Sequence, residues 1–315
     1  MKLFDGLHKS VRALAREVKS AHLPPRLDPP KPCRIGLAFG GGFARGLAHV
    51  GVLKVLEEEG IVPDFIAGTS VGAVIGAAYC SGVSAKELEE LAAIVRFKDF
   101  ARYTISRFGL CTNDRMTGFL QRILKVKTFE ELRIPLAVTA TDFLTGEPIV
   151  FTKGKLIDPV RASCAYPGVF LPVNVDGKMM VDGLLGHAVP AKPLKQMGAD
   201  RVAAVFFSAH WVQKSPRHVL EVIGQCFSIA QANMSCLWQA HADLLIEPDV
   251  SAFGFDDFQK ALSLVKVGEE AARQALPTFR AWAAERAAHR DYVAPTEAKK
   301  VSLAPSAMQQ PVALG

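Results

Sequence analysis

Short continuous apolar runs alternate with helically spaced apolar positions in the early part of the chain. Residues 35–39 and 62–67 form apolar runs, and a turn containing glycine follows each of them. Apolar residues then recur every three or four positions from Leu47 to Leu56, and residues 71–80 are a run of small and apolar side chains. Runs of the first kind are typical of buried strands, and the wider spacing is typical of helices. The pattern predicts two successive βα units with parallel strands and a right-handed crossover.

The same two patterns continue toward the C-terminus. We expect four more helices, at residues 84–95, 117–124, 219–240 and 258–276, and we expect Pro277 to end or kink the last of them. We expect further strands at residues 134–141 and 201–207, and a turn into a returning strand at residues 143–151. A returning strand beside parallel strands predicts a mixed sheet.

The two ends of the chain follow different patterns. Apolar residues of segment 1–22 keep helical spacing while Lys and Arg occupy the other faces, which predicts an amphipathic basic helix. Two interpretations stay open for it: contact of residues 1–20 with an anionic membrane, and packing on protein. The proline-rich segment 23–32 is expected to be a semi-rigid linker, and the aperiodic segment 291–315 a disordered tail. The folded domain would span residues 33–290.

Composition narrows the class of protein. The chain has 315 residues, of which 50% are hydrophobic, enough for one large α/β core. No window reaches the roughly 18 uninterrupted apolar residues of a membrane-spanning helix. The first residues mix charged and apolar side chains, unlike a secretory signal, and the six cysteines lack paired spacing. We therefore expect reduced thiols, no metal and no other cofactor, in a cytoplasmic protein that can lie on the inner face of the membrane.

The net charge of +6 is compatible with binding to an anionic surface. Much of the excess lies at the two ends of the chain rather than in a basic stripe interleaved with aromatic residues. Nucleic acid is therefore not expected as a partner. The sequence does not fix the oligomeric state.

Ser70 lies between a predicted strand and a predicted helix, in the sequence Gly68-Thr69-Ser70-Val71-Gly72. Glycines two positions to either side permit a sharp, strained turn that exposes the serine hydroxyl at a helix N-terminus. A serine becomes a nucleophile only when a base takes its proton and fixed donors stabilise the oxyanion. Ser70 is therefore a candidate nucleophile for acyl transfer.

The glycine-rich loop at residues 40–46 supplies candidate donors. Gly41 and Gly42 can turn their N–H groups toward a carbonyl oxygen, and the helix that follows adds its dipole. Nucleotide binding is the alternative for this loop. The dinucleotide fingerprint G-x-G-x-x-G fails because Phe43 stands at the second glycine position when Gly46 is the third, and the lysine of a P-loop is missing.

Asp182 follows a strand-like segment and precedes Gly183, so it is a candidate base at a strand end. Taken alone, it would be interpreted as an ordinary turn aspartate. A conventional triad with histidine is the alternative. His187 follows Asp182 too closely for the usual separate acid and base loops, and His49 lies inside the first predicted helix, where packing or capping is expected.

Four segments occur in the order found in the bacterial patatin-like phospholipases, residues 41–46, 68–72, 161–170 and 181–183. The chain resembles that family from about residue 32 to about residue 277. The resemblance implies a three-layer α/β/α sandwich around a mixed, mostly parallel sheet. It also implies a serine lipid acyl hydrolase of phospholipase A or lysophospholipase type, with a phospholipid or lysophospholipid as substrate and no metal.

The resemblance assigns roles to the matched residues. Ser70 would be the nucleophile and Asp182 the base of a catalytic dyad, and Arg45 would stabilise the glycine-rich loop. The oxyanion hole would be made by three backbone N–H groups, those of Gly41, Gly42 and Phe43. The family often has glycine where Phe43 stands; phenylalanine can donate its N–H at negative φ, whereas a positive φ would cost stability.

Position along the chain suggests five side chains for an acyl pocket, Met116, Phe143, Tyr166, Phe170 and Leu171. The alternative function is a lipid-binding or regulatory protein of the same fold that does not turn its ligand over.

Overall fold

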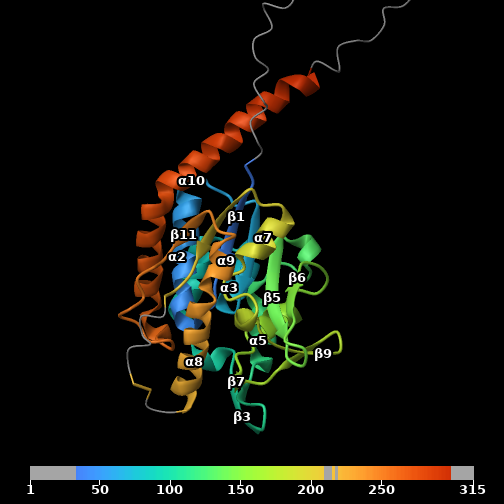
Figure 1. The fold of residues 1–315 in the computed structure, drawn as a ribbon, viewed down its shortest axis with the longest axis vertical. Coiled ribbons are helices and arrows are strands. Elements are labelled where there is room, and N and C mark those ends of the chain that lie inside the picture. Colours follow the sequence, from blue (N-terminus) through green and yellow to red (C-terminus); the bar gives the residue numbers. More distant parts are fainter. Residues whose placement is uncertain (1–32, 209–214, 217–218, 299–315) are drawn as a thin grey trace, which may run out of the picture. The chain divides into compact units, whose positions relative to one another are not determined.

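The computed structural model describes three ranges, residues 33–208, 215–216 and 219–298 (Figure 1). Three predicted segments lie outside the described residues: the helix 1–22, the linker 23–32 and residues 299–315 of the tail. The chain divides into two units, one spanning Pro32–Arg286 and one made of Met1–Lys31 with Ala287–Gly315. Every strand that the structure describes belongs to the unit Pro32–Arg286.

The central sheet has eight strands within the described residues. In spatial order they are β11 (Leu244–Ile246), β10 (Arg201–Val205), β1 (Ile35–Phe39), β2 (Phe65–Thr69), β5 (Leu136–Asp142), β9 (Lys178–Asp182) and β8 (Val173–Val175), with β6 (Pro148–Phe151) also paired to β5. The first five run parallel. Strands β6, β8 and β9 run antiparallel to their neighbours, which confirms the mixed sheet.

Helices cover both faces of this sheet (Figure 1). Leu37 and Phe39 of β1 point into a core shared with α2 (Ala48–Glu58), α3 (Val71–Cys80) and α10 (Ala261–Ala298). Ala38 points the other way, toward Leu194 of α7 (Ala191–Met197). Successive side chains of a strand alternate between the two faces of the sheet, so the apolar residues of β1 contribute to a hydrophobic core on each face. The three-layer α/β/α architecture is confirmed.

Besides short 3₁₀ segments, the described part also contains five more α-helices and a small second sheet. The helices are α4 (Ala85–Ile94), α5 (Asp114–Ile123), α6 (Ile157–Ser163), α8 (Val219–Asn233) and α9 (Ser235–Gln239). The second sheet consists of β3 (Arg102–Ser106), β4 (Gly109–Thr112) and β7 (Gly168–Phe170). No helix in the described ranges combines the length and the apolar composition needed to cross a bilayer.

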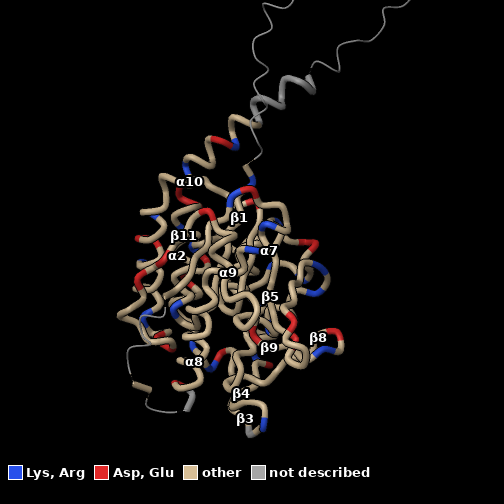
Figure 2. The backbone as a smooth tube through the Cα atoms, viewed as in Figure 1, with Lys and Arg blue, Asp and Glu red and all other residues tan. Residues whose placement is uncertain are grey.

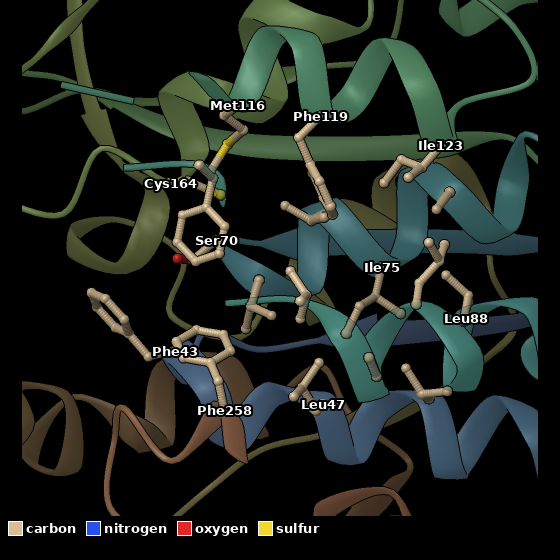
Figure 3. A pocket seen from close by; sticks show the side chains of 18 of the residues that line it. Phe43, Leu47, Ser70, Ile75, Leu88, Met116, Phe119, Ile123, Cys164 and Phe258 are labelled. Atoms are coloured by element: carbon tan, nitrogen blue, oxygen red, sulfur yellow. The ribbon is translucent and has the colours of Figure 1, made fainter. Parts of the chain in front are cut away.

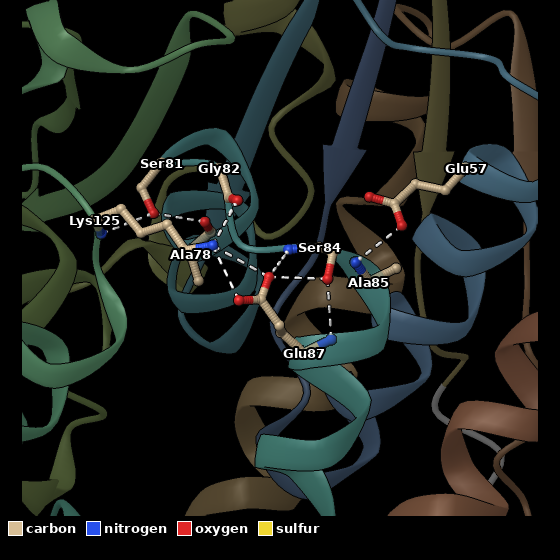
Figure 4. A network of polar contacts seen from close by, with 8 residues as sticks. All are labelled: Glu57, Ala78, Ser81, Gly82, Ser84, Ala85, Glu87 and Lys125. Carbon is tan, nitrogen blue, oxygen red and sulfur yellow. Dashed lines mark hydrogen bonds and ion pairs between the residues drawn. The ribbon is translucent and has the colours of Figure 1, made fainter.

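A network of polar contacts fixes the start of α4 (Figure 4). The Ser84 hydroxyl accepts the N–H of Glu87 at 3.2 Å, and the Glu87 carboxylate accepts the N–H of Ser84 at 2.7 Å. Lys125 pairs with Glu87 at 3.0 Å, and Glu57 accepts the N–H of Ala85 at 3.0 Å. The hydrogen bond from the Ser84 backbone, followed by the contact with Lys125, lowers the pKa of Glu87 to about 2. A capping box of this kind sets where a helix begins.

Two expectations for the C-terminal helices were wrong. The predicted helix at residues 219–240 is divided into α8 and α9 at Met234. Residues 291–298, expected in a disordered tail, belong to helix α10, which continues past Pro277 to Ala298 rather than ending there. An interior proline costs about 3 kcal/mol, but the turns after it are anchored: Phe279 is fully buried, and Arg280 pairs with Glu59 at 2.8 Å.

Candidate active site

Ser70 occupies the sharp turn between β2 and α3. Its backbone adopts φ 56° and ψ −124°, a strained conformation for a residue with a side chain, and its N–H donates to the Ser163 hydroxyl at 2.8 Å. A Cβ on Gly72 would collide with the carbonyl oxygen of Phe39, and a Cβ on Gly68 would collide with the backbone of Gly72. The predicted need for both glycines thus has a steric cause.

Asp182 ends β9, and strand pairing brings it beside the end of β2. Strand β6 pairs with residues 138–141 of β5. Residues 138–139 also pair with β2, and residues 140–141 also pair with β9. Because one edge of a strand serves one partner at a given residue, β2 and β9 must share the other edge of β5. Thr69 pairs with Thr139, and Asp182 pairs with the next residue, Ala140. The carboxyl ends of β2 and β9 therefore meet, which places Ser70 and Asp182 close together.

The Asp182 carboxylate is fully buried and only partly engaged. Its Oδ1 accepts the N–H of Leu184 at 3.0 Å, while Oδ2 has no hydrogen-bond partner of standard geometry among the described residues. Burial raises the pKa of Asp182 to about 7, although the Leu184 N–H and the nearby Ser70 hydroxyl both lower it. Burial penalises the charged form, so this carboxylate is a stronger base than an exposed aspartate.

Cys164 and Tyr166 also lie near Ser70 or Asp182. Burial and then the charge of Asp182 raise the pKa values of the Cys164 thiol and the Tyr166 hydroxyl, and the Ser70 hydroxyl interacts with the thiol. Cys164 is therefore protonated and unreactive at neutral pH. Its small side chain fills space beside Ser70.

The glycine-rich loop lies against Ser70. A Cβ on Gly41 would be 3.5 Å from Ser70 Cβ. The Gly41 N–H already donates to Ala188 O over a long 3.3 Å, whereas the N–H groups of Gly42 and Phe43 donate to no other described residue. Two of the three predicted oxyanion donors are thus open, and the third is weakly engaged.

Phe43 has a positive φ of 52°, the strained alternative of the two considered from sequence. Its ring packs edge-on against Tyr166 and Phe255, with ring centres 5.3 and 5.8 Å away. Such aromatic pairs contribute about 0.5–1.5 kcal/mol each, which is of the size needed to hold a left-handed residue. The side chain therefore compensates for the missing glycine.

Arg45, in the glycine-rich loop, and His49, which contacts that loop, are both buried. Arg45 is buried; burial lowers its pKa, and the charges of Asp257 and Asp256 raise it. His49 is fully buried, and burial lowers its pKa to about 4, so the imidazole is neutral and its Nε2–H donates to Gly40 O at 2.9 Å. No histidine is among the groups that shift the pKa of Asp182.

An apolar cavity of about 110 Å³ begins at Ser70 (Figure 3). One face of each of three helices lines it: Val71, Val74, Ile75 and Ala78 from α3, Leu88, Leu91 and Ala92 from α4, and Met116, Phe119 and Ile123 from α5. In Figure 3, Phe43, Met116 and Cys164 lie at the Ser70 end, and Leu88 and Ile123 lie farther along. A single water needs roughly 10–15 Å³, so the cavity has room for a hydrocarbon segment.

Only part of the predicted pocket lining was right. Met116 and Phe170 line the cavity, whereas Phe143, Tyr166 and Leu171 do not. Phe143 is 47% exposed on the loop between β5 and β6. The helical faces of α3, α4 and α5 supply most of the lining instead, because their apolar residues recur every three or four positions.

Comparison with known proteins gives matches in sequence and structure. The family model described as patatin-like phospholipase matches residues 37–195. An uncharacterized NTE family protein of Mycobacterium tuberculosis is 36% identical over 181 residues, 55% of this chain and 48% of that protein. Mouse patatin-like phospholipase domain-containing protein 6 is 32% identical over 184 residues, 54% of this chain and 13% of that protein. The chain spans about half the length of the mycobacterial relatives.

Among solved structures, VipD from Legionella pneumophila aligns with a TM-score of 0.47 and 15% identity, over 79% of this chain and 67% of that one. The type III effector protein ExoU aligns with a TM-score of 0.40 and 12% identity, over 80% of this chain and 54% of that one.

Proposed function

Because the chain belongs to the patatin-like phospholipase family, we propose that it hydrolyses carboxylic esters of phospholipids or lysophospholipids with a Ser70–Asp182 dyad. The observation that carries the proposal is the meeting of β2 and β9 on one edge of β5. It puts a hydroxyl at a helix N-terminus beside a buried carboxylate that has one open oxygen.

In the proposed reaction, Asp182 Oδ2 accepts the proton of Ser70 while Oγ attacks the ester carbonyl. The carbonyl oxygen becomes an oxyanion, which the N–H groups of Gly42 and Phe43 stabilise, and the long Gly41 bond can be shared with it. The protonated carboxyl group then donates its proton to the departing alcohol, which leaves an acyl ester on Ser70. Water, deprotonated by the same carboxylate, then attacks the acyl ester; the bond to Ser70 Oγ breaks, Asp182 returns the proton to Oγ, and the fatty acid is released.

The apolar cavity supports a lipid acyl group as the part of the substrate that is bound. It begins at Ser70 and is lined by carbon-rich side chains of α3, α4 and α5. Removing an acyl chain from water in such a cavity supplies roughly 0.8 kcal/mol per buried methylene. The chemistry of the leaving alcohol is not constrained by this cavity.

The test is hydrolysis of a panel of phospholipids and lysophospholipids by the wild-type chain and by two variants. We expect Ser70→Ala and Asp182→Asn to lower turnover by about a hundredfold or more. Asp142→Asn is the matched control, because Asp142 is also buried at a strand end and accepts the N–H of Leu144 at 3.0 Å, two residues on, as Asp182 does with Leu184. Near-normal turnover by either dyad variant, or an equal loss in the control, would refute the proposed dyad.

A further inference from the structure

The hairpin formed by β3 and β4 carries large apolar side chains into solvent. It projects from the body of the unit Pro32–Arg286 (Figure 1). Tyr103 is 82% exposed, Leu110 47% and Phe108 43%. Single exposed apolar residues are common on protein surfaces, but such residues gathered on one projecting hairpin indicate a contact surface.

Basic residues outnumber acidic ones in the segment that contains the hairpin, and Figure 2 shows a basic position near its tip. Between residues 96 and 115 there are two acidic residues, Asp99 and Asp114, and five basic ones, Arg96, Lys98, Arg102, Arg107 and Arg115. Asp114 is already paired with Arg102 at 3.7 Å and with Arg161 at 3.2 Å. The Arg107 guanidinium lies over the Phe108 ring, 4.8 Å from its centre, and forms no ion pair with a described residue. The hairpin thus combines exposed aromatic rings with one cation that forms no ion pair within the described residues, Arg107, in a segment with an excess of positive charge.

The base of the hairpin is also part of the wall around the candidate active site. Strand β4 pairs with β7, where Cys111 lies opposite Phe170, and Phe170 lines the acyl cavity. Phe100, just before β3, lines the same cavity. Ala101 and Cys111 pack with Phe170 and with Phe43 of the glycine-rich loop. A surface that engages the hairpin would therefore be held near the Ser70 end of the cavity.

We propose that the β3–β4 hairpin docks on the surface of a bilayer that contains anionic lipids. Tyrosine and phenylalanine favour the boundary between headgroups and acyl chains. Arginine can place its stem there while its guanidinium remains among the phosphates. The positive excess selects an anionic surface, and each basic residue near such a surface strengthens binding about fivefold. The inference rests on the proposed function for its purpose, since docking would bring lipid to the cavity.

Binding is measured by sedimentation with vesicles, using the full chain with Ser70→Ala so that no lipid is consumed. Vesicles of phosphatidylcholine alone are compared with vesicles that also contain phosphatidylglycerol. We expect the protein to pellet only with the mixed vesicles. Arg107→Gln should weaken binding about fivefold, and the double variant Tyr103→Ser/Phe108→Ser should weaken it about tenfold or more.

Two controls carry changes of the same kind elsewhere. Phe143→Ser/Leu144→Ser removes exposed apolar side chains from the β5–β6 loop and should bind like the parent chain. Arg12→Gln/Arg16→Gln removes two charges from the predicted N-terminal helix. Unchanged binding by both hairpin variants, or loss only in the N-terminal variant, would overturn the proposal.

A second readout keeps this result separate from the proposed function. With Ser70 present, the hairpin variants should hydrolyse a soluble short-chain ester at the wild-type rate, which shows that they are folded, and should lose activity on mixed vesicles. An inactive wild-type chain that still pellets with mixed vesicles would refute the hydrolase and leave the docking surface intact. Equal loss on soluble ester and vesicles would count against docking.

Discussion

At the residue scale, the two carboxylate oxygens of Asp182 differ in their hydrogen bonding. Oδ1 is held by the Leu184 N–H, which orients the carboxyl group, and Oδ2 is open among the described residues. Complete burial raises the pKa of this carboxyl to about 7. A carboxylate with a pKa near neutrality accepts a proton from serine more readily than an ordinary aspartate does, and its protonated form can still donate that proton to a leaving alcohol.

This pKa predicts a pH profile. Below about pH 7 the Asp182 carboxyl is protonated in the folded protein and cannot accept the Ser70 proton, so kcat/KM should fall as the pH is lowered through that value. Rates on a soluble ester between pH 5 and 9 give the profile of the free enzyme. Asp142→Asn should keep the same profile, and a wild-type rate that is flat across neutrality would show that Asp182 is not the base.

Thr69 and Thr139 form a buried hydrogen-bonded pair next to Ser70 and Asp182. Thr69 Oγ1 donates to His187 O at 2.6 Å, so the 2.7 Å bond between the two hydroxyls must be donated by Thr139. Both side chains are fully buried, and Thr139 also contacts Gly183, the residue after Asp182. The pair joins the end of β2 to the turn that follows Asp182.

Thr139→Val keeps the shape of this side chain but removes its donor. We expect a loss of about 1 kcal/mol in stability and a lower kcat with little change in KM, because Asp182 is displaced relative to Ser70 while the acyl cavity is untouched. Thr139→Ser should restore kcat. If the valine and serine variants have the same kcat, the hydroxyl does not position the dyad.

Only some of the residues around Ser70 and Asp182 could be predicted from the sequence. The glycines around Ser70 were predicted because their role depends on local backbone sterics. The contacts of Thr139, Ser163 and His49 around the loop, Ser70 and Asp182 were not predicted. Their hydrogen-bond partners lie on other elements or outside their own helical turn, so the spacing of residues along the chain does not predict these contacts.

At the element scale, local pattern predicted the interior of the elements it identified better than their ends. The strand at 35–39 and the helix at 71–80 have the predicted bounds. The strand expected at 62–67 begins instead at Phe65, because Pro63 provides no N–H and Val62 is 52% exposed. Where contacts with residues far along the chain determine how far an element extends, as they do for α10 beyond Pro277, the local pattern predicted the wrong end.

Helix α4 offers a test of the capping network. Glu87→Gln removes the charge that interacts with Lys125 and with the start of the helix, so Tm should fall by a few degrees at pH 7. Because the pKa of Glu87 is lowered to about 2, its contribution is present above the unfolded value of 4.5 and is lost as the pH falls toward 2. Thermal melts should show the two proteins converging over that interval; a constant difference in Tm would contradict the assignment.

The three apolar helix faces predict a chain-length effect. Val74 lies on the cavity face of α3, one turn beyond Val71, so Val74→Phe should fill the cavity a short way from Ser70. We expect hydrolysis of short-chain esters to be retained and hydrolysis of long-chain esters to drop by about tenfold or more. A series of p-nitrophenyl esters of increasing length measures this, and equal loss at all lengths would mean that the acyl chain lies elsewhere.

At the scale of the whole molecule, the candidate site depends on the switch from parallel to antiparallel pairing along β5. Strand β2 arrives from the parallel half of the sheet and β9 from the antiparallel half, and both end at the middle of one edge of β5. Composition and periodicity predicted a mixed sheet but could not predict this register, since the segments lie far apart in the chain. The proximity of Ser70 and Asp182 was expected only from the resemblance of their motifs to a family.

The central claim is that Asp182 activates Ser70, and the rate of phosphonylation by a fluorophosphonate probe tests it most directly. Mass spectrometry of the wild-type chain should place the phosphonyl group on Ser70, and Asp182→Asn should slow labelling by about a hundredfold or more while Asp142→Asn labels at the wild-type rate. Labelling of Asp182→Asn as fast as the wild type, or modification at a residue other than Ser70, would contradict the account.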